Sequence, residues 1–167
     1  MLFCKLLGCA LLVLAGAAAG GKRAEATAQR AKYLAAMGVF LGEVDAALQY
    51  SPQPTAHLLA QAQQSAGLAL HFETLCDGPR LPADISRALE KAQAEHSAVP
   101  AREWEQFAAA ILRVGQVDAP QARQALAYAN QYLERAAREA AEQAQKDRKL
   151  YYTLGLSAGA AAALLLI

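Results

Sequence analysis

The sequence predicts an all-α protein: a compact six-helix cytosolic domain with long antiparallel first and last helices, flanked by N- and C-terminal transmembrane segments. Three observations lead to this fold class. Hydrophobic residues make up 55% of the 167-residue chain and aromatic residues only 7%, because alanine, the best helix former, is abundant and β-branched residues are scarce. Apolar runs occupy both ends. Between them, apolar residues recur at alternating spacings of three and four, the period of a helix packed on one face.

The first apolar run predicts a transmembrane anchor over residues 1–21. Leu6 to Ala19 is almost unbroken apolar sequence, and Met1 to Phe3 extend it past Lys5, so that the whole stretch is just long enough to span a bilayer. The same run also fits a cleaved secretory signal, with Ala17 to Ala19 as the small-residue cleavage site. Lys22 and Arg23 follow it and are predicted interface anchors. They favour the uncleaved anchor, because the positive-inside bias keeps the more basic flank in the cytosol.

The second apolar run, residues 150–167, contains no charged residue and predicts a C-terminal transmembrane segment. Basic and aromatic residues at its start are the predicted interface anchors. They are Lys146, Arg148, Lys149, Tyr151 and Tyr152. Because both apolar runs have basic inner flanks, the domain between them, residues 22–149, is predicted to face the cytosol.

Small residues spaced by four occur in both apolar runs, a pattern that lets helix backbones approach closely in lipid. They are Gly16 and Gly20 in the first run, and Gly155, Gly159 and Ala163 in the second. Packing between membrane helices, within one chain or in a homo-oligomer, is one interpretation. The other is that glycine and alanine are simply common in an alanine-rich protein.

Residues 24–50 are predicted to form the first, long helix of the domain. Its apolar stripe alternates by three and four. The stripe residues are Leu34, Met37, Leu41, Val44 and Leu48. Pro52 and Pro54 then end the helix, because each removes a backbone donor and biases its predecessor away from the α region.

Four short helices are predicted next. Their ranges are residues 56–66, 68–75, 82–96 and 101–114. Turn-forming segments separate them at Gly67, at Asp77 to Pro79 and at Ser97 to Pro100. The apolar faces of the last two predict core residues. These are Ile85, Leu89, Trp104, Phe107, Ile111 and Leu112.

The last helix is predicted to follow a clear boundary. Gly115 stops the preceding helix, and Asp118, two residues before Pro120, is a good N-cap. No helix breaker lies between Gln121 and Tyr152, so this helix is predicted to run into the membrane. Its seam residues are Ala122, Leu126, Ala129, Leu133, Ala136 and Ala140. Three i,i+4 pairs are expected on its solvated side. They are Glu134–Arg138, Arg135–Glu139 and Arg138–Glu142.

The sequence offers no signal for an enzyme, a cofactor or a metal. A net charge of +1 gives no global attraction to nucleic acid. The motifs of nucleotide hydrolases, zinc proteases and serine hydrolases are absent from the sequence. Its three histidines are scattered singly, and no Cys/His cluster has metal-ligand spacing. We therefore expect a non-enzymatic protein whose partners are other proteins and lipid.

Two long segments resemble the stage III sporulation protein AB family of endospore-forming bacteria. They are LRVGQVDAPQARQAL, from Leu112 to Leu126, and KDRKLYYTLGLSAGAAAALLLI, from Lys146 to Ile167. The opening MLFCKLLG and the segment LGEVDAALQYSPQP are more weakly similar. One departure precedes the last helix: the family pattern is closer to leucine-glycine, a serine and then aspartate, whereas this chain has Val114, Gly115, Val117 and Asp118.

The resemblance implies a structural protein of the mother-cell membrane that faces the engulfed forespore, within a channel complex. The family is similar to the inner-membrane platform protein F of type II secretion systems, which has a six-helix cytosolic domain. The implied partners are the sporulation ATPase, stage III AA, and other membrane channel components. The rival hypothesis from another functional class is an exported helical binding module with a cleaved N-terminal signal peptide and a C-terminal membrane anchor.

Overall fold

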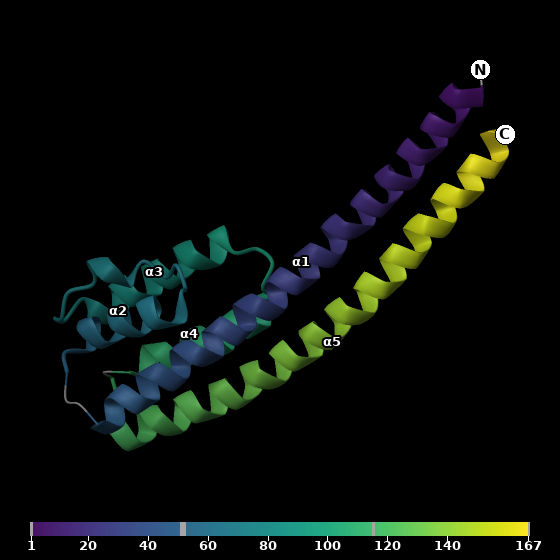
Figure 1. Ribbon diagram of the computed structural model, residues 1–167. Helices are drawn as coiled ribbons and strands as arrows, with labels where there is room; N and C mark the ends of the chain where they lie inside the picture. The colour runs from purple at the N-terminus through teal and green to yellow at the C-terminus, as the bar shows by residue number, and fades with distance from the viewer. Residues whose placement is uncertain (1, 51–52, 115, 167) are drawn as a thin grey trace. The chain divides into compact units, whose positions relative to one another are not determined.

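Helices are the regular elements of the part of the chain that the structure, a computed structural model, describes (Figure 1). The described backbone covers residues 2–50, 53–114 and 116–166, and the described side chains are those of residues 25, 27–50, 53–114, 116–151, 153, 154 and 157. The elements are α1 (Leu2–Tyr50), α2 (Thr55–Ala66), the 3₁₀ turn η1 (Phe72–Thr74), α3 (Leu81–Glu95), α4 (Ala101–Arg113) and α5 (Ala119–Leu166). The all-α prediction is confirmed.

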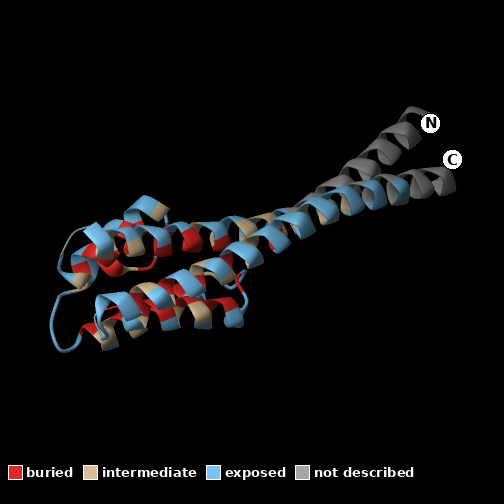
Figure 2. Ribbon diagram, turned by 90° about the horizontal axis from the view of Figure 1, so that it is seen from below, coloured by how far each residue is buried: buried red, intermediate tan, exposed pale blue. Residues whose placement is uncertain are grey.

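The chain divides into two compact units: Lys32–Arg138, and Met1–Ala31 together with Glu139–Ile167. In the first unit, helix faces that point toward one another carry the buried residues (Figure 2). The predicted stripe of α1 is buried from Leu34 to Val44, whereas Leu48 is half-buried. On α5 the predicted seam is buried from Ala122 to Leu133.

Aromatic rings form the centre of the unit Lys32–Arg138. The ring of Phe40 on α1 lies 5.9 Å from that of Phe72 and 5.5 Å from that of Phe107, and Trp104 meets Phe107 edge-on at 5.8 Å. All four side chains are almost fully buried. Tilted and edge-to-face pairs of this kind add to the free energy gained from area burial. Phe40 therefore connects helix α4 with the loop that precedes α3.

The helices α1 and α5 are antiparallel in this unit, as predicted (Figure 1). Their contacts advance in opposite directions along the two helices. The Arg123 Nε–H donates to Asp45 Oδ1 at 2.8 Å, and seven residues earlier on α1 a Cβ at Gly38 would lie 3.2 Å from Asn130 Oδ1. Gly38 thus marks a close approach of the two helices.

The predicted helix at residues 68–75 is wrong. Gly67 ends α2 in the left-handed conformation (φ 64°), and His71 has φ 61°, a conformation that an α-helix cannot contain. An extended chain and the single turn η1 occupy this range instead. The described part of the chain consequently holds five α-helices and one 3₁₀ turn, which corrects the six-helix prediction.

The second unit, Met1–Ala31 with Glu139–Ile167, contains the ends of α1 and α5 that the sequence predicts to lie next to a membrane. Here the Thr27 hydroxyl donates to Asp147 Oδ2 at 3.5 Å, and Ala140 is buried. Within the described residues, no helix is both long and apolar enough to cross a membrane. The predicted anchor of residues 1–21 and most of residues 150–167 lie outside the described side chains.

Of the three ion pairs expected on α5, one forms. Arg138 Nη2 lies 3.8 Å from Glu134 Oε2. Arg135 with Glu139, and Arg138 with Glu142, form no ion pair, although all four side chains are described. Exposed pairs of this type contribute little to stability, so α5 depends mainly on its buried face.

Candidate functional site: a groove between α4 and α5

A groove of about 630 Å³ lies between α4 and α5 in the unit Lys32–Arg138. Its lining residues are Gln106, Ala109, Ala110 and Arg113 from α4, and Gln121, Gln124, Ala125, Tyr128 and Ala129 from α5. We call it the α4–α5 groove. Ala110 and Ala129 are buried in its floor. With small side chains there, the backbone of a docking helix can approach closely.

One row of residues from each helix borders the groove. On α4 the row is Arg102, Gln106, Ala109 and Arg113; on α5 it is Gln121, Ala125, Tyr128 and Tyr132. Arg102 and Tyr132 continue the two rows beyond the residues that line the groove. Both rows have spacings of four, three and four, so each lies on a single helix face. The two helices are antiparallel (Figure 1), and the Arg102 guanidinium carbon lies 5.9 Å from the centroid of the Tyr132 ring. Arg113 consequently borders the other end, beside Gln121.

The groove is rich in the residue types that dominate protein interfaces. Tyr128, at its middle, is 68% exposed, and tyrosine and arginine are over-represented among the residues that contribute most binding energy. Within the described part of the chain neither the Arg113 nor the Arg102 side chain has a hydrogen bond or an ion pair, and the Arg102 guanidinium lies over the Tyr132 ring. Helix α4 contains two carboxylates: Glu103 is buried, and Glu105 is exposed at the edge of this face. The two guanidiniums therefore remain available to carboxylates of a partner.

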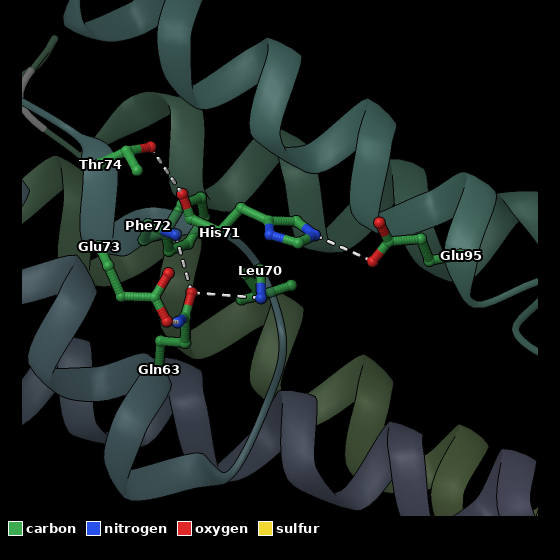
Figure 3. A network of polar contacts seen from close by, with 7 residues as sticks. All are labelled: Gln63, Leu70, His71, Phe72, Glu73, Thr74 and Glu95. Atoms are coloured by element: carbon green, nitrogen blue, oxygen red, sulfur yellow. Dashed lines mark hydrogen bonds and ion pairs between the residues drawn. The ribbon is translucent and has the colours of Figure 1, made fainter.

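Apart from the groove, a cluster of polar contacts around Gln63 has a structural role: it determines the path of the loop after α2 (Figure 3). Gln63 is almost fully buried, and its Oε1 accepts hydrogen bonds from the backbone N–H groups of Leu70 and Phe72 at 3.2 and 2.9 Å. Its amide nitrogen donates to Glu73. Buried backbone donors need partners, and one glutamine side chain supplies them where no helix does.

A surface ion pair fastens the same loop to α3 (Figure 3). The His71 Nε2 lies 2.9 Å from Glu95 Oε2. Its hydrogen bond, together with the charges of His71, Lys91 and His96, lowers the pKa of Glu95 below its ordinary value against the opposing effect of desolvation. Burial, with the nearby Glu95 charge, raises the pKa of Tyr33, so this hydroxyl stays protonated.

These polar clusters do not assemble a metal or catalytic centre. No group of three or more His, Cys, Asp or Glu side chains among the described residues could hold a metal ion. Cys76 is exposed and unpaired with another cysteine. The Tyr33 hydroxyl and the Trp104 indole N–H are buried without a hydrogen-bond partner among the described atoms, and the two rings lie 6.1 Å apart, centroid to centroid.

The residues predicted from sequence as site residues have varied positions. Lys146, Arg148 and Lys149 are exposed on α5, and Tyr151 is half-buried. Asp118 immediately precedes α5, where its backbone carbonyl accepts from the Ala122 N–H at 3.0 Å. The remaining predicted residues lie outside the described side chains. They are Gly16, Gly20, Lys22, Arg23, Gly115, Tyr152, Gly155, Gly159 and Ala163.

Sequence reasoning did not identify the α4–α5 groove. The available signal was the shared spacing of the two rows, because Arg102 and Arg113 fall on one face of α4 and Tyr128 and Tyr132 on one face of α5. Without the antiparallel arrangement of the helices, these rows could not be recognised as the two sides of one surface.

A family model described as "Stage III sporulation protein AB" matches residues 5–167. The match includes both apolar runs and every helix of the unit Lys32–Arg138. Comparisons with curated proteins and with solved structures found no match.

Proposed function

Because the chain belongs to the stage III sporulation protein AB family, we propose that it is a non-enzymatic membrane platform of the mother cell–forespore channel complex. The observation that carries this proposal is the extent of the family match, which includes both terminal apolar runs as well as the helical unit between them. A role in sporulation follows from the family. The platform role combines that membership with the basic flanks and apolar ends of the chain.

In this proposal the chain is held in the mother-cell membrane by residues 1–21 and 150–167, and the domain between them faces the mother-cell cytosol. Continuity of the helices supports it, since α1 and α5 each extend from the unit Lys32–Arg138 into a terminal run without a break. The exposed Lys146, Arg148 and Lys149 next to the second run suit the headgroup region.

The domain then serves as an adaptor for the sporulation ATPase, stage III AA. The chain itself lacks a nucleotide-binding motif, so energy from hydrolysis must come from another protein. Its core of packed aromatic rings makes the domain rigid, as an adaptor that holds a partner in a fixed position requires. Its other partners in this proposal are the membrane components of the channel.

Intact mass and protease protection test the membrane arrangement. We expect membrane-extracted protein from sporulating cells to retain its residues before Ala19, and protease added to the cytosolic side of sealed membranes to digest the domain. A product that begins after Ala19, with the domain protected, would instead support the exported binding module with a cleaved signal peptide.

Co-purification tests the adaptor role. The full chain, extracted in mild detergent, is expected to retain the stage III AA ATPase, and a chain without residues 53–114 is not. Retention by both chains would assign the contact to residues outside 53–114, and retention by neither would remove the ATPase from the proposal.

A further inference from the structure

We propose that the α4–α5 groove of one copy of this chain receives helix α3 of a second copy. The contact joins two different surfaces, so it is heterologous: every copy offers both a groove and an α3. Such contacts close into rings or continue as rows, depending on the rotation between neighbours. The inference rests on a match of charge, spacing and direction between the two surfaces.

The face of α3 that matches the groove is a row with carboxylates at both ends. It consists of Asp84, Ala88, Lys91 and Glu95, again with spacings of four, three and four. Lys91 and Glu95 are exposed, and Asp84 and Ala88 are half-buried. Asp84 and Glu95 are eleven residues apart, as Arg102 and Arg113 are on α4. At 1.5 Å per residue both separations are about 16 Å, so both carboxylates can reach a guanidinium at once.

The residues in the middle of the α3 and α4 rows favour one direction of α3 in the groove. When α3 runs antiparallel to α4, Asp84 meets Arg113 and Glu95 meets Arg102. Ala88 then faces Ala109, and the Lys91 ammonium lies at the level of the exposed Tyr128 ring, where a cation is attracted to the ring face. The opposite direction pairs the same end charges but sets Lys91 against the alanines and forfeits that contact.

Both carboxylates already have partners within the chain, but these leave room for an arginine. Asp84 lies 3.3 Å from Arg87, and Glu95 lies 2.9 Å from His71, with 38% and 43% of the two acidic side chains exposed. A carboxylate can accept about four hydrogen bonds, and exposed ion pairs are weak enough to rearrange. Arg113 in the groove has no such partner among the described residues.

The path of the chain also places the α3 row and the α4–α5 groove at the same height along the unit. Only residues 96–100 separate α3 from α4, and these helices run in opposite directions (Figure 1). Glu95 and Arg102 are therefore at the same end of the unit, as the proposed pairing requires. In copies that stand side by side in one membrane, Glu95 of one copy and Arg102 of its neighbour lie at the same height above the membrane. This step alone rests on the proposed function.

An engineered disulfide tests the contact in cells that make the full chain. Cys4, Cys9 and Cys76 are replaced by serine, and Ala88→Cys and Ala109→Cys are introduced together. Because the contact is heterologous, oxidation is expected to give a ladder of dimers, trimers and larger species on a non-reducing gel. With Ala83→Cys in place of Ala88→Cys, on the outer face of α3, no ladder is expected.

Charge reversal shows whether the stated pairs cause the ladder. Arg113→Glu is expected to lower the cross-linked fraction about tenfold, and Asp84→Arg in the same chain to restore it. Arg102→Glu with Glu95→Arg forms a second, independent swap in case one variant folds poorly, and Arg135→Glu, an exposed arginine of α5 outside the groove, is the control that leaves the ladder unchanged.

Three results would overturn the proposal: no cross-linking of the Ala88–Ala109 cysteine pair, a product that stops at the dimer, or a ladder that survives both single reversals. Protease protection on the same cells reports the membrane arrangement separately. A failed ladder with a cytosolic, protease-accessible domain therefore rejects the groove contact and leaves the platform proposal standing.

Discussion

Within Lys32–Arg138, the first and last helices pack with different kinds of side chain. The buried face of α1 is made of large residues, whereas that of α5 alternates alanine with leucine. On α1 they are Leu34, Met37, Phe40, Leu41 and Val44; on α5 they are Ala122, Leu126, Ala129 and Leu133. Large side chains fill the space among several neighbours, and small ones permit close approach to a single neighbour.

This difference suggests separate roles for the two helices: α1 stabilises the unit, and α5 offers a surface for association. Phe40 contacts both the loop before α3 and α4, so α1 connects parts of the unit that are distant in sequence. By contrast, α5 contributes a thin buried seam and keeps Tyr128 and its neighbours on the surface of the groove. Substitutions in α1 are therefore expected to change the free energy of unfolding, and substitutions on the groove face of α5 to change association.

The largest expected effect is that of Phe40→Ala. Loss of a fully buried phenylalanine at the meeting point of three elements costs about 3 to 5 kcal/mol of unfolding free energy. Denaturation followed by fluorescence of Trp104, the single tryptophan of the chain, measures it in this unit. Tyr128→Ala on α5 and Val39→Ala on the exposed side of α1 are the controls, each within about 0.5 kcal/mol of the unmodified chain. Equal losses in Phe40→Ala and Tyr128→Ala would contradict the comparison.

Gln63→Ala is next in size, because it removes the acceptor that holds the loop over α1. The N–H groups of Leu70 and Phe72 would both lose their hydrogen bonds, at a cost of about 2 to 3 kcal/mol. The neighbouring exposed Gln64→Ala is the matched control, with little change expected. A small effect of Gln63→Ala in the same denaturation experiment would mean that the Phe40–Phe72 contact positions the loop without the glutamine.

The same loop explains what the sequence could and could not predict. Apolar residues repeating at three and four identified α1, α3, α4 and α5, and turn-forming residues on either side delimited α2. The turn signals alone gave the wrong helix after Gly67, where Leu68, Leu70 and Phe72 are all buried and are spaced by two, the period of an extended chain. The buried role of Gln63 was not predictable, because its partners are backbone groups of a loop whose path depends on that side chain.

Two glycines of α1 give an internal comparison of its two sides. At Gly42 a Cβ would meet no atom within 4 Å, so Gly42→Ala is expected to stabilise the unit by about 0.5 to 1 kcal/mol through helix propensity. At Gly38 the Cβ would lie 3.2 Å from Asn130 Oδ1 on α5, and Gly38→Ala is expected to lose that gain.

Asn130→Ala decides whether the α5 contact causes the difference. In that background Gly38→Ala should recover a stabilisation close to that of Gly42→Ala, as a double-mutant cycle on thermal or denaturant unfolding would measure. If Gly38→Ala stabilises the unmodified chain as much as Gly42→Ala does, α1 and α5 are not in close contact at this point.

The smallest expected effect is that of the His71–Glu95 pair, which tests whether surface charge or the buried amide of Gln63 holds the loop over α1. His71 lowers the pKa of Glu95 in the folded protein. The stability linked to this carboxylate is therefore fully present above the unfolded pKa, about 4.3, and is lost as the pH falls through the lower, folded pKa.

The variant His71→Gly tests this pair, because it removes the ring and suits the left-handed backbone at this residue. In this variant the pKa of the Glu95 carboxyl, measured by NMR titration, should rise toward its ordinary value. His57→Ala, on α2, should leave that titration unchanged. Because the pair is exposed, unfolding at neutral pH should change far less in His71→Gly than in Gln63→Ala; a comparable loss would assign the position of the loop to the ion pair.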